Sequence, residues 1–243
     1  MVPNFRPPRL AELYAQRWTA DTFRWRALGA RDKVRNIERV VAPVQRRIHR
    51  VLEVGCGTGV VLNALSRTLG TELVGIDVSD ENGHREPPAS PAVRFEIYDG
   101  AHVPFDDCSF DLVYATHVLE HVLDEREFLH ELRRVARGYI YVEVPCELHV
   151  RTSIRMLQQS LEIGHVNAYT PESLALTLET SGLEVLTLQV FDHSYALHRF
   201  HMSPVKALAK TALRRSLLSL SEHVATRVFT YHAAALCQRA PLI

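Results

Sequence analysis

Short hydrophobic runs alternate with helical patterns along most of the chain. Runs rich in β-branched residues predict strands near residues 50–54, 73–77, 93–97, 110–115 and 139–144. Hydrophobic positions at helical spacing predict helices near residues 60–69, 124–136 and 172–181. Because strands that alternate with helices are typical of parallel sheets, the pattern predicts a doubly wound α/β fold.

The two ends of the chain and one connection depart from this alternation. Residues 10–49 predict two helices before the first strand. Residues 81–91 hold three prolines and one glycine, so a loop is expected there in place of a regular helix. Near the end of the chain, residues 183–191 and 226–237 predict strands, and residues 204–220 predict a helix between them.

A glycine-rich segment follows the first predicted strand. Glu53 precedes three glycines at alternate positions, Gly55, Gly57 and Gly59, which let the backbone turn tightly and approach a ligand. The helix that begins after them offers backbone N–H groups to a polar or anionic ligand group. Asp77 ends the next strand, where a carboxylate can accept hydrogen bonds from both hydroxyls of a ribose. These residues predict a nucleoside site at the carboxyl edge of a parallel sheet.

The spacing of the glycines decides between two nucleoside-binding families. A dinucleotide-binding fingerprint would need a third glycine where Val60 stands. An acidic residue followed by GxGxG instead resembles the first motif of class I S-adenosylmethionine-dependent methyltransferases. The resemblance covers roughly residues 35–190, is nearest to their type 11 branch, and implies S-adenosylmethionine as the cofactor. It also implies a Rossmann-like sheet of seven strands in the order 3-2-1-4-5-7-6, with strand 7 antiparallel and helices on both faces.

Residues 1–243 are accordingly expected to form one methyltransferase domain. Residues 1–49 would form a helical cap, whose aromatic residues either close over the ligands as a lid or pack the first helices on the sheet. Residues 50–145 would bind the cofactor, and residues 146–243, with inserted helices, would face the substrate. The aromatic residues of the cap are Tyr14, Trp18, Phe23 and Trp25.

The resemblance assigns cofactor contacts to the ends of the second, third and fourth strands. Val78 would pack on the adenine. Asp99, which precedes Gly100, matches the acidic residue that accepts a hydrogen bond from the adenine amino group in the family, although an aspartate before glycine is also typical of a turn. Thr116 and His117 leave the fourth strand where the family contacts the methionine end of the cofactor.

The segment FDLVYATHVLEHV resembles the fourth motif of the same branch. A helix starting here would place His117, Glu120 and His121 near one face, because residues three and four positions apart are neighbours on a helix. That spacing could bind a divalent cation. Because His117 replaces the acidic residue of the family pattern, no metal is predicted. His121 is then either a helix-packing residue or a general base.

A second motif, GHxxxYTPESL, surrounds Gly164 and His165 and also resembles the family. His165 lies where the family presents residues to substrate. A neutral imidazole that titrates near neutrality can remove a proton from a hydroxyl or an ammonium, so His165 is the first candidate for a base. The alternative is a structural hydrogen bond that fixes this loop. The inserted connection adds a candidate substrate wall at His193, Tyr195 and Phe200.

Composition narrows the classes of function. The chain has 243 residues, is 47% hydrophobic and has a formal net charge of zero, which argues against a dedicated nucleic-acid binder. Residues 1–50 are nevertheless basic, with twelve Lys/Arg and four Asp/Glu. The four cysteines form no CxxC pair and indicate reduced thiols in a cytoplasmic protein. No stretch approaches a membrane span, and the chain could form a homodimer.

These features predict a methyltransferase that uses S-adenosylmethionine and acts on a small-molecule acceptor, with O-methylation slightly favoured over N-methylation. A nucleic-acid methyltransferase is supported only by the basic N-terminal segment, and the fourth loop lacks the NPPY-type tetrapeptide used on base amines. A non-catalytic subunit that keeps the fold to bind partners is the other alternative. The glycine-rich segment, Asp77 and Asp99 argue against it.

Overall fold

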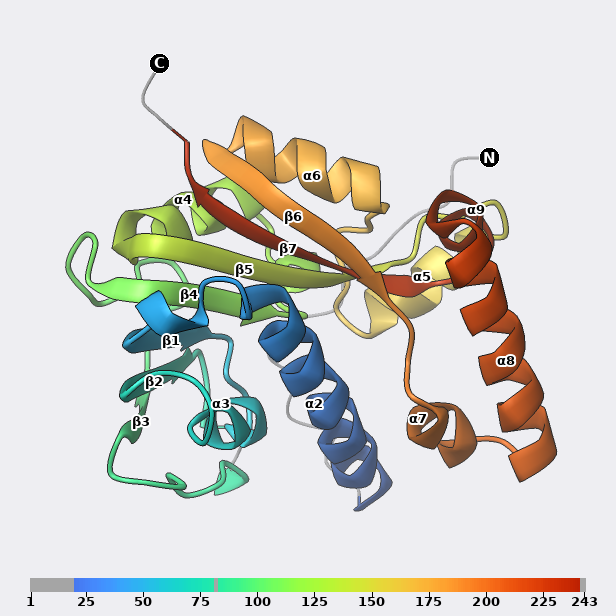
Figure 1. Cartoon of the computed structure of the whole chain (residues 1–243), viewed down its shortest axis with the longest axis horizontal. Coiled ribbons are helices and arrows are strands. Elements are labelled where there is room, and N and C mark those ends of the chain that lie inside the picture. Colours follow the sequence, from blue (N-terminus) through green and yellow to red (C-terminus); the bar gives the residue numbers. More distant parts are fainter. Residues whose placement is uncertain (1–19, 81–82, 241–243) are drawn as a thin grey trace.

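The computed structural model describes residues 20–80 and 83–240, and in this part of the chain seven strands form one sheet (Figure 1). They are β1 (Arg50–Val54), β2 (Glu72–Asp77), β3 (Val93–Ile97), β4 (Phe110–Thr116), β5 (Ala136–Cys146), β6 (Leu183–Phe191) and β7 (Tyr231–Arg239). Their order is β3-β2-β1-β4-β5-β7-β6. β7 runs antiparallel to β5 and β6, and the other neighbours are parallel. The predicted order and the reversed seventh strand are confirmed.

Helices cover both faces of the sheet, as Figure 1 shows. On one face, α2 and α3 bury Ile37 and Leu65 against the strands. On the other face, α4 and α6 bury Leu132 and Leu178 in a second hydrophobic cluster. Because β-branched and other apolar residues of the central strands are buried on both faces, these strands are hydrophobic almost without interruption. The four helices are α2 (Ala20–Val41), α3 (Val60–Leu65), α4 (Glu125–Val135) and α6 (Pro171–Thr180).

The helix boundaries follow local sequence signals. Thr170 and Ser173 form a capping box at the start of α6, with Pro171 in its first turn, as the sequence indicates. Residues 83–91 contain no α-helix, which confirms the predicted loop after β2. α3 is shorter than the predicted helix, because residues 66–68 continue it only as turns.

A single long helix, α2, precedes a 3₁₀ turn, η1 (Gln45–Arg47), and β1. The first of the two helices predicted before β1, with Tyr14 and Trp18, lies outside the described residues, as does the side chain of Phe23. Trp25, on α2, is exposed to solvent.

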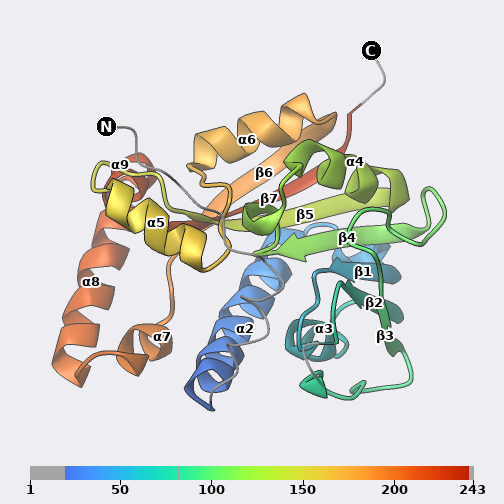
Figure 2. The same cartoon turned by 180° about the vertical axis from the view of Figure 1, so that it is seen from behind.

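Two connections near the end of the chain carry more helix than the sequence predicted. The helix predicted over residues 204–220 is confirmed, but residues 226–228 are helical where a strand was expected. The reason is that the Ser221 side chain accepts a hydrogen bond from Val224 N–H and starts a further helix, so β7 begins only at Tyr231. Figure 2 shows α5 beside α8 and α9. The additional helices are α5 (Ile154–Glu162), α7 (Tyr195–Phe200), α8 (Pro204–Leu220) and α9 (Glu222–Val228).

The strand register brings distant residues to one edge of the sheet. Thr116 at the end of β4 is level with Glu143 of β5. Because β7 runs antiparallel to β5, its first residues lie at the carboxyl end of β5, with His232 opposite Pro145. The carboxyl ends of β1, β2, β4 and β5 and the start of β7 therefore meet at this edge, which we call the carboxyl edge.

Candidate functional site

The loop after β1 has a backbone that only glycine adopts readily. Gly55, Gly57 and Gly59 have φ of 79°, 51° and 77°. A Cβ added to Gly55 would lie 2.3 Å from a methyl carbon of Val118, and one added to Gly59 would lie 2.5 Å from the ring of Phe95. The positive φ explains all three glycines, and lack of space is a second reason at Gly55 and Gly59.

Asp77 joins this loop to the end of β2. Its Oδ2 accepts a hydrogen bond of 2.7 Å from Gly57 N–H, and its Oδ1 accepts one of 3.3 Å from Ser79 N–H. The side chain is buried. The predicted ribose acceptor therefore lies directly beside the predicted cofactor loop.

The loops after β2 and β3 lie against each other. Val78 is 57% exposed, and a Cβ on Gly100 would lie 2.9 Å from one of its methyl carbons. Asp99 Oδ1 accepts hydrogen bonds from the backbone N–H groups of Ala101 and His102, and these bonds lower the pKa of the exposed carboxyl. Asp99 is thus a turn residue, which is one of the two alternatives that the sequence left open. It also lies next to the predicted adenine site.

Several ionisable groups are buried where β1, β4 and β5 end. Glu53 and Glu120 are only 2% and 1% exposed, and burial raises the pKa of Glu53 to about 8 and that of Glu120 to about 7. Lys33 of α2 donates a 3.4 Å hydrogen bond to the carbonyl of Thr116, and burial lowers the pKa of its ammonium. Glu143 adds a third carboxylate near Lys33. Among these groups, acidic side chains outnumber basic ones.

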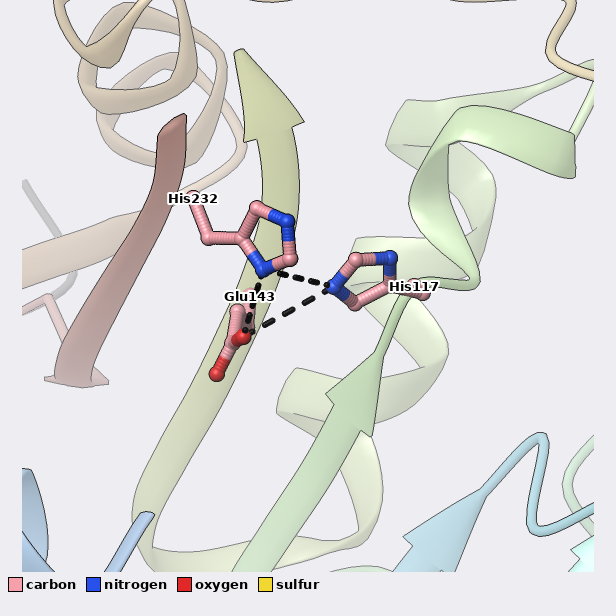
Figure 3. A group of neighbouring side chains, drawn as sticks. All are labelled: His117, Glu143 and His232. Carbon is pink, nitrogen blue, oxygen red and sulfur yellow. Dashed lines mark hydrogen bonds and ion pairs between the residues drawn. The ribbon is translucent and has the colours of Figure 1, made fainter. Parts of the chain in front are cut away.

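His117 leaves β4 with a φ of 58°, which is unusual for a residue with a side chain. Its backbone N–H donates a 2.8 Å hydrogen bond to the carbonyl of Glu143. Its ring Nε2 lies 3.3 Å from Nδ1 of His232 and 3.6 Å from Oε1 of Glu143 (Figure 3). Burial lowers the pKa of the His117 imidazole well below its usual value, so the ring is neutral. Beyond it, the rings of His193 and His232 are 4.4 Å apart.

The helix expected to carry His117, Glu120 and His121 on one face is not formed. The left-handed conformation of His117 ends β4 abruptly, and only a 3₁₀ turn, η3 (Leu119–His121), follows. Nδ1 of His121 lies 2.9 Å from the carbonyl oxygen of Gly164.

His121 instead lies beside the other candidate base. The rings of His121 and His165 are 4.8 Å apart, and His165 Nδ1 is 2.9 Å from Oε2 of Glu147. Glu120 belongs to the same group, since one of its oxygens and one nitrogen of each ring lie within 4.8 Å of one another. Both candidate bases therefore lie together, on the β4–β5 side of the carboxyl edge.

The sequence did not point to every residue of this region. Glu143, Glu147 and His232 were not among the candidates. The one available signal was an ionisable residue inside a hydrophobic strand, as Glu143 is in YIYVEVPC. His193 of the predicted substrate wall does border the cluster, whereas Tyr195 is exposed.

Comparison with known proteins gives a family match over most of the chain. A family model described as a methyltransferase domain matches residues 23–188. Tocopherol O-methyltransferase of Arabidopsis thaliana is 31% identical over 122 residues, which are 47% of this chain and 35% of that protein. Ajmaline N-methyltransferase of Rauvolfia serpentina is 27% identical over 124 residues, or 49% of this chain and 42% of that protein. The matched part thus spans less than half the length of either relative.

Solved structures share the fold. Geranyl diphosphate methyltransferase, solved with its SAM ligand, has a TM-score of 0.62 at 13% identity, with 86% of this chain and 85% of that chain covered. The [4+2]-cyclase SpnF has a TM-score of 0.59 at 20% identity, with 86% and 81% covered. The second case shows that this fold also supports other reactions. No helix in the described residues has the length and apolar character needed to cross a membrane.

Proposed function

Because the chain belongs to the methyltransferase domain family, we propose that it transfers a methyl group from S-adenosylmethionine to a small-molecule acceptor. The observation that carries the proposal is the hydrogen bond between Gly57 N–H and the buried carboxylate of Asp77. This bond holds the glycine-rich loop beside a carboxylate that can accept hydrogen bonds from the hydroxyls of a ribose. Both lie at the edge where open α/β sheets bind ligands.

The arrangement of groups along the carboxyl edge suggests how the cofactor would lie. Asp77 would accept the ribose hydroxyls, and Val78, Asp99 and Gly100 would surround the adenine. Glu53, Thr116 and His117 would lie toward the methionine end. The excess of buried carboxylates supports this direction, since the cofactor brings a sulfonium and an ammonium that would offset their charge.

The acceptor would be bound beside His165 and His121. When bound, the cofactor supplies an electrophilic methyl carbon, and the acceptor atom forms its bond to that carbon as the carbon–sulfur bond breaks. We assign proton removal to His165. Oε2 of Glu147 lies 2.9 Å from Nδ1 of His165. This leaves Nε2 of the ring to take the proton of a hydroxyl or ammonium. His121, in ring contact with His165, would position it.

The class of acceptor is proposed from the relatives. The two relatives described above are named for O- and N-methylation of small molecules, and O-methylation remains the first choice. Nucleic acid is not the expected acceptor. A homodimer and a cytoplasmic location stay predictions.

Cofactor binding offers the most direct test. Asp77→Ala removes charge-assisted hydrogen bonds, each contributing about 1.5–3 kcal/mol, so the affinity for S-adenosylmethionine measured by calorimetry should fall at least about tenfold. The matched control is Asp106→Ala, which removes an exposed carboxylate after β3 and should leave the affinity unchanged. Transfer of labelled methyl groups to a panel of small hydroxyl and amine compounds would then identify the acceptor. Unchanged affinity in a folded Asp77→Ala protein would contradict the assigned ribose site.

A further inference from the structure

Three ligand-type atoms meet where β4 and β5 end and β7 begins. Nε2 of His117 and Nδ1 of His232 are 3.3 Å apart, and Oε1 of Glu143 lies 3.6 Å from the first and 3.3 Å from the second (Figure 3). The three residues come from three separate strand ends. Figure 3 shows both rings and the carboxylate directed at one common point.

We propose that His117, Glu143 and His232 bind a divalent transition metal ion of the zinc type through two imidazoles and one carboxylate. The proposal concerns metal binding alone and does not depend on the proposed methyl transfer. It departs from the sequence-based prediction of no metal, because Glu143 and His232 are distant from His117 in the sequence.

The distances fit a tetrahedral ion better than an octahedral one. With metal–ligand bonds of 2.0–2.1 Å, tetrahedral ligands lie ~3.3–3.4 Å apart. Octahedral ligands at similar bond lengths would lie only ~3.0 Å apart. The observed separations of 3.3, 3.3 and 3.6 Å are close to those of one face of such a tetrahedron. Two imidazoles and a carboxylate around an open position is also the donor set of catalytic zinc sites.

The groups behind the three ligands are those that a metal site uses. Glu143 is fully buried and accepts hydrogen bonds from Tyr141 O–H and, at 3.2 Å, from Asn36 Nδ2. The second ring nitrogen of His117 lies 3.4 Å from Oε1 of Glu120, and neither oxygen of Glu120 has a hydrogen-bond partner among the described residues. A carboxylate that accepts a hydrogen bond from the distal nitrogen of a metal-bound histidine fixes its tautomer, and Glu120 is placed to take that role when a metal binds.

A proton in place of a metal ion would not give all three atoms of His117, Glu143 and His232 a partner. A single N–H between His117 and His232 can serve one pair of atoms, whereas a metal ion uses the lone pairs of all three at once. The neighbouring group of Glu120, His121 and His165 also brings three ligand-type atoms within 4.8 Å of one another, but it contains the proposed base, His165. We place the metal on the His117 side because the three separations there, 3.3, 3.3 and 3.6 Å, match those of a tetrahedral ion.

The left-handed backbone of His117 agrees with this assignment. A φ of 58° in a residue with a side chain is strained, and such strain is found where the surroundings hold a functional group in place. Here the bond from His117 N–H to the Glu143 carbonyl ties one ligand residue to another. The rigid strands thereby fix the distances between the donor atoms.

The test uses the full chain, stripped with a chelator and titrated with Zn²⁺ by calorimetry and with Co²⁺ by visible absorption. We expect one ion per chain and the intense cobalt bands of a four-coordinate site. His117→Ala, Glu143→Gln and His232→Ala should each weaken Zn²⁺ binding by ~100-fold or more, and Tyr141→Phe by ~10-fold. His223→Ala, an exposed histidine on α9, is the matched control and should bind like the wild type.

X-ray absorption on the zinc-loaded wild type keeps the test independent of whether the variants fold. Two imidazoles and one carboxylate oxygen around the ion would support the site. The proposal is overturned if the stripped chain binds neither ion. It is also overturned if His232→Ala keeps wild-type affinity, or if His165→Ala loses the ion while His232→Ala retains it.

Discussion

The two sides of the carboxyl edge are built from different chemical groups. On the side of β1, β2 and β3, the site consists mainly of backbone, with three glycines at positive φ and one carboxylate bonded to Gly57. On the side of β4, β5 and β7, it consists of buried side chains, among them Glu143 and the rings of His117 and His232. On the first side, the backbone leaves no room for added side-chain atoms. On the second side, buried side chains supply charges and lone pairs.

This difference predicts different failures. A site built from backbone is lost when an atom is added, because the loop has no space for it. A site built from side chains is lost when a proton acceptor or charge is removed, even if the shape is kept. Matched substitutions on the two sides can therefore separate binding from chemistry.

The largest effect is expected from removing the proposed base. His165→Ala should lower turnover by ~10²–10⁴-fold while the affinity for S-adenosylmethionine stays close to that of the wild type. The reason is that His165 would take the proton from the small molecule that is methylated but would not contact the nucleoside of the cofactor. Turnover is measured with the acceptor found in the labelled-methyl screen, and affinity by calorimetry.

Two further variants sharpen that result. Glu147→Gln keeps the shape but removes the carboxylate partner of His165, and should lower turnover by a smaller factor. His149→Ala removes a nearby histidine that bonds Thr230 and should leave turnover unchanged. Wild-type turnover and pH profile in both His165→Ala and His121→Ala would mean that no histidine base is used.

A smaller effect is expected when an atom is added on the backbone side. Gly59→Ala forces a positive φ on alanine and places its Cβ 2.5 Å from the ring of Phe95. Strain of about 1–3 kcal/mol should weaken cofactor binding roughly ten- to hundredfold. Gly29→Ala is the control, because nothing lies within 4 Å of its Cβ and alanine favours a helix. Normal affinity in Gly59→Ala would mean that the loop does not contact the cofactor.

The same division explains what the sequence could predict. The glycine-rich loop lies within a few residues of β1, and Asp77 ends the next strand, so local spacing was sufficient to find them. His117, Glu143 and His232 are brought together only by the sheet register, including the reversed β7.

Two local predictions were wrong, one because of a non-local hydrogen bond and one because of a local helix cap. The helix expected from His117 onward is absent because the His117 N–H bonds to the carbonyl of Glu143 on a neighbouring strand. The β-branched residues of α9 resemble a strand, and only the cap at Ser221 makes them helical. Local patterns therefore predicted the strands and the glycine-rich loop, and the family resemblance predicted their order, but neither pointed to Glu143, Glu147 or His232.

The remaining effect is on folding stability, through Glu53, which lies between the two sides. Burial raises its pKa from 4.5 to about 8 in the folded protein. Between these values the unfolded chain loses the proton while the folded chain keeps it, so Glu53 makes the free energy of unfolding fall as pH rises from 4.5 to about 8. Above that range, both states are ionised and the penalty is constant.

Glu53→Gln removes this titration and keeps the shape. Relative to the wild type without cofactor, the variant should gain stability as pH rises through this window, by a few kcal/mol and at most about 5 kcal/mol at its upper end, measured by urea unfolding at several pH values. Saturating S-adenosylmethionine should reduce the gain, because its positive charge would stabilise the Glu53 carboxylate. A stability difference that does not change with pH would show that Glu53 is ionised throughout the window, with Lys33 as its counter-charge.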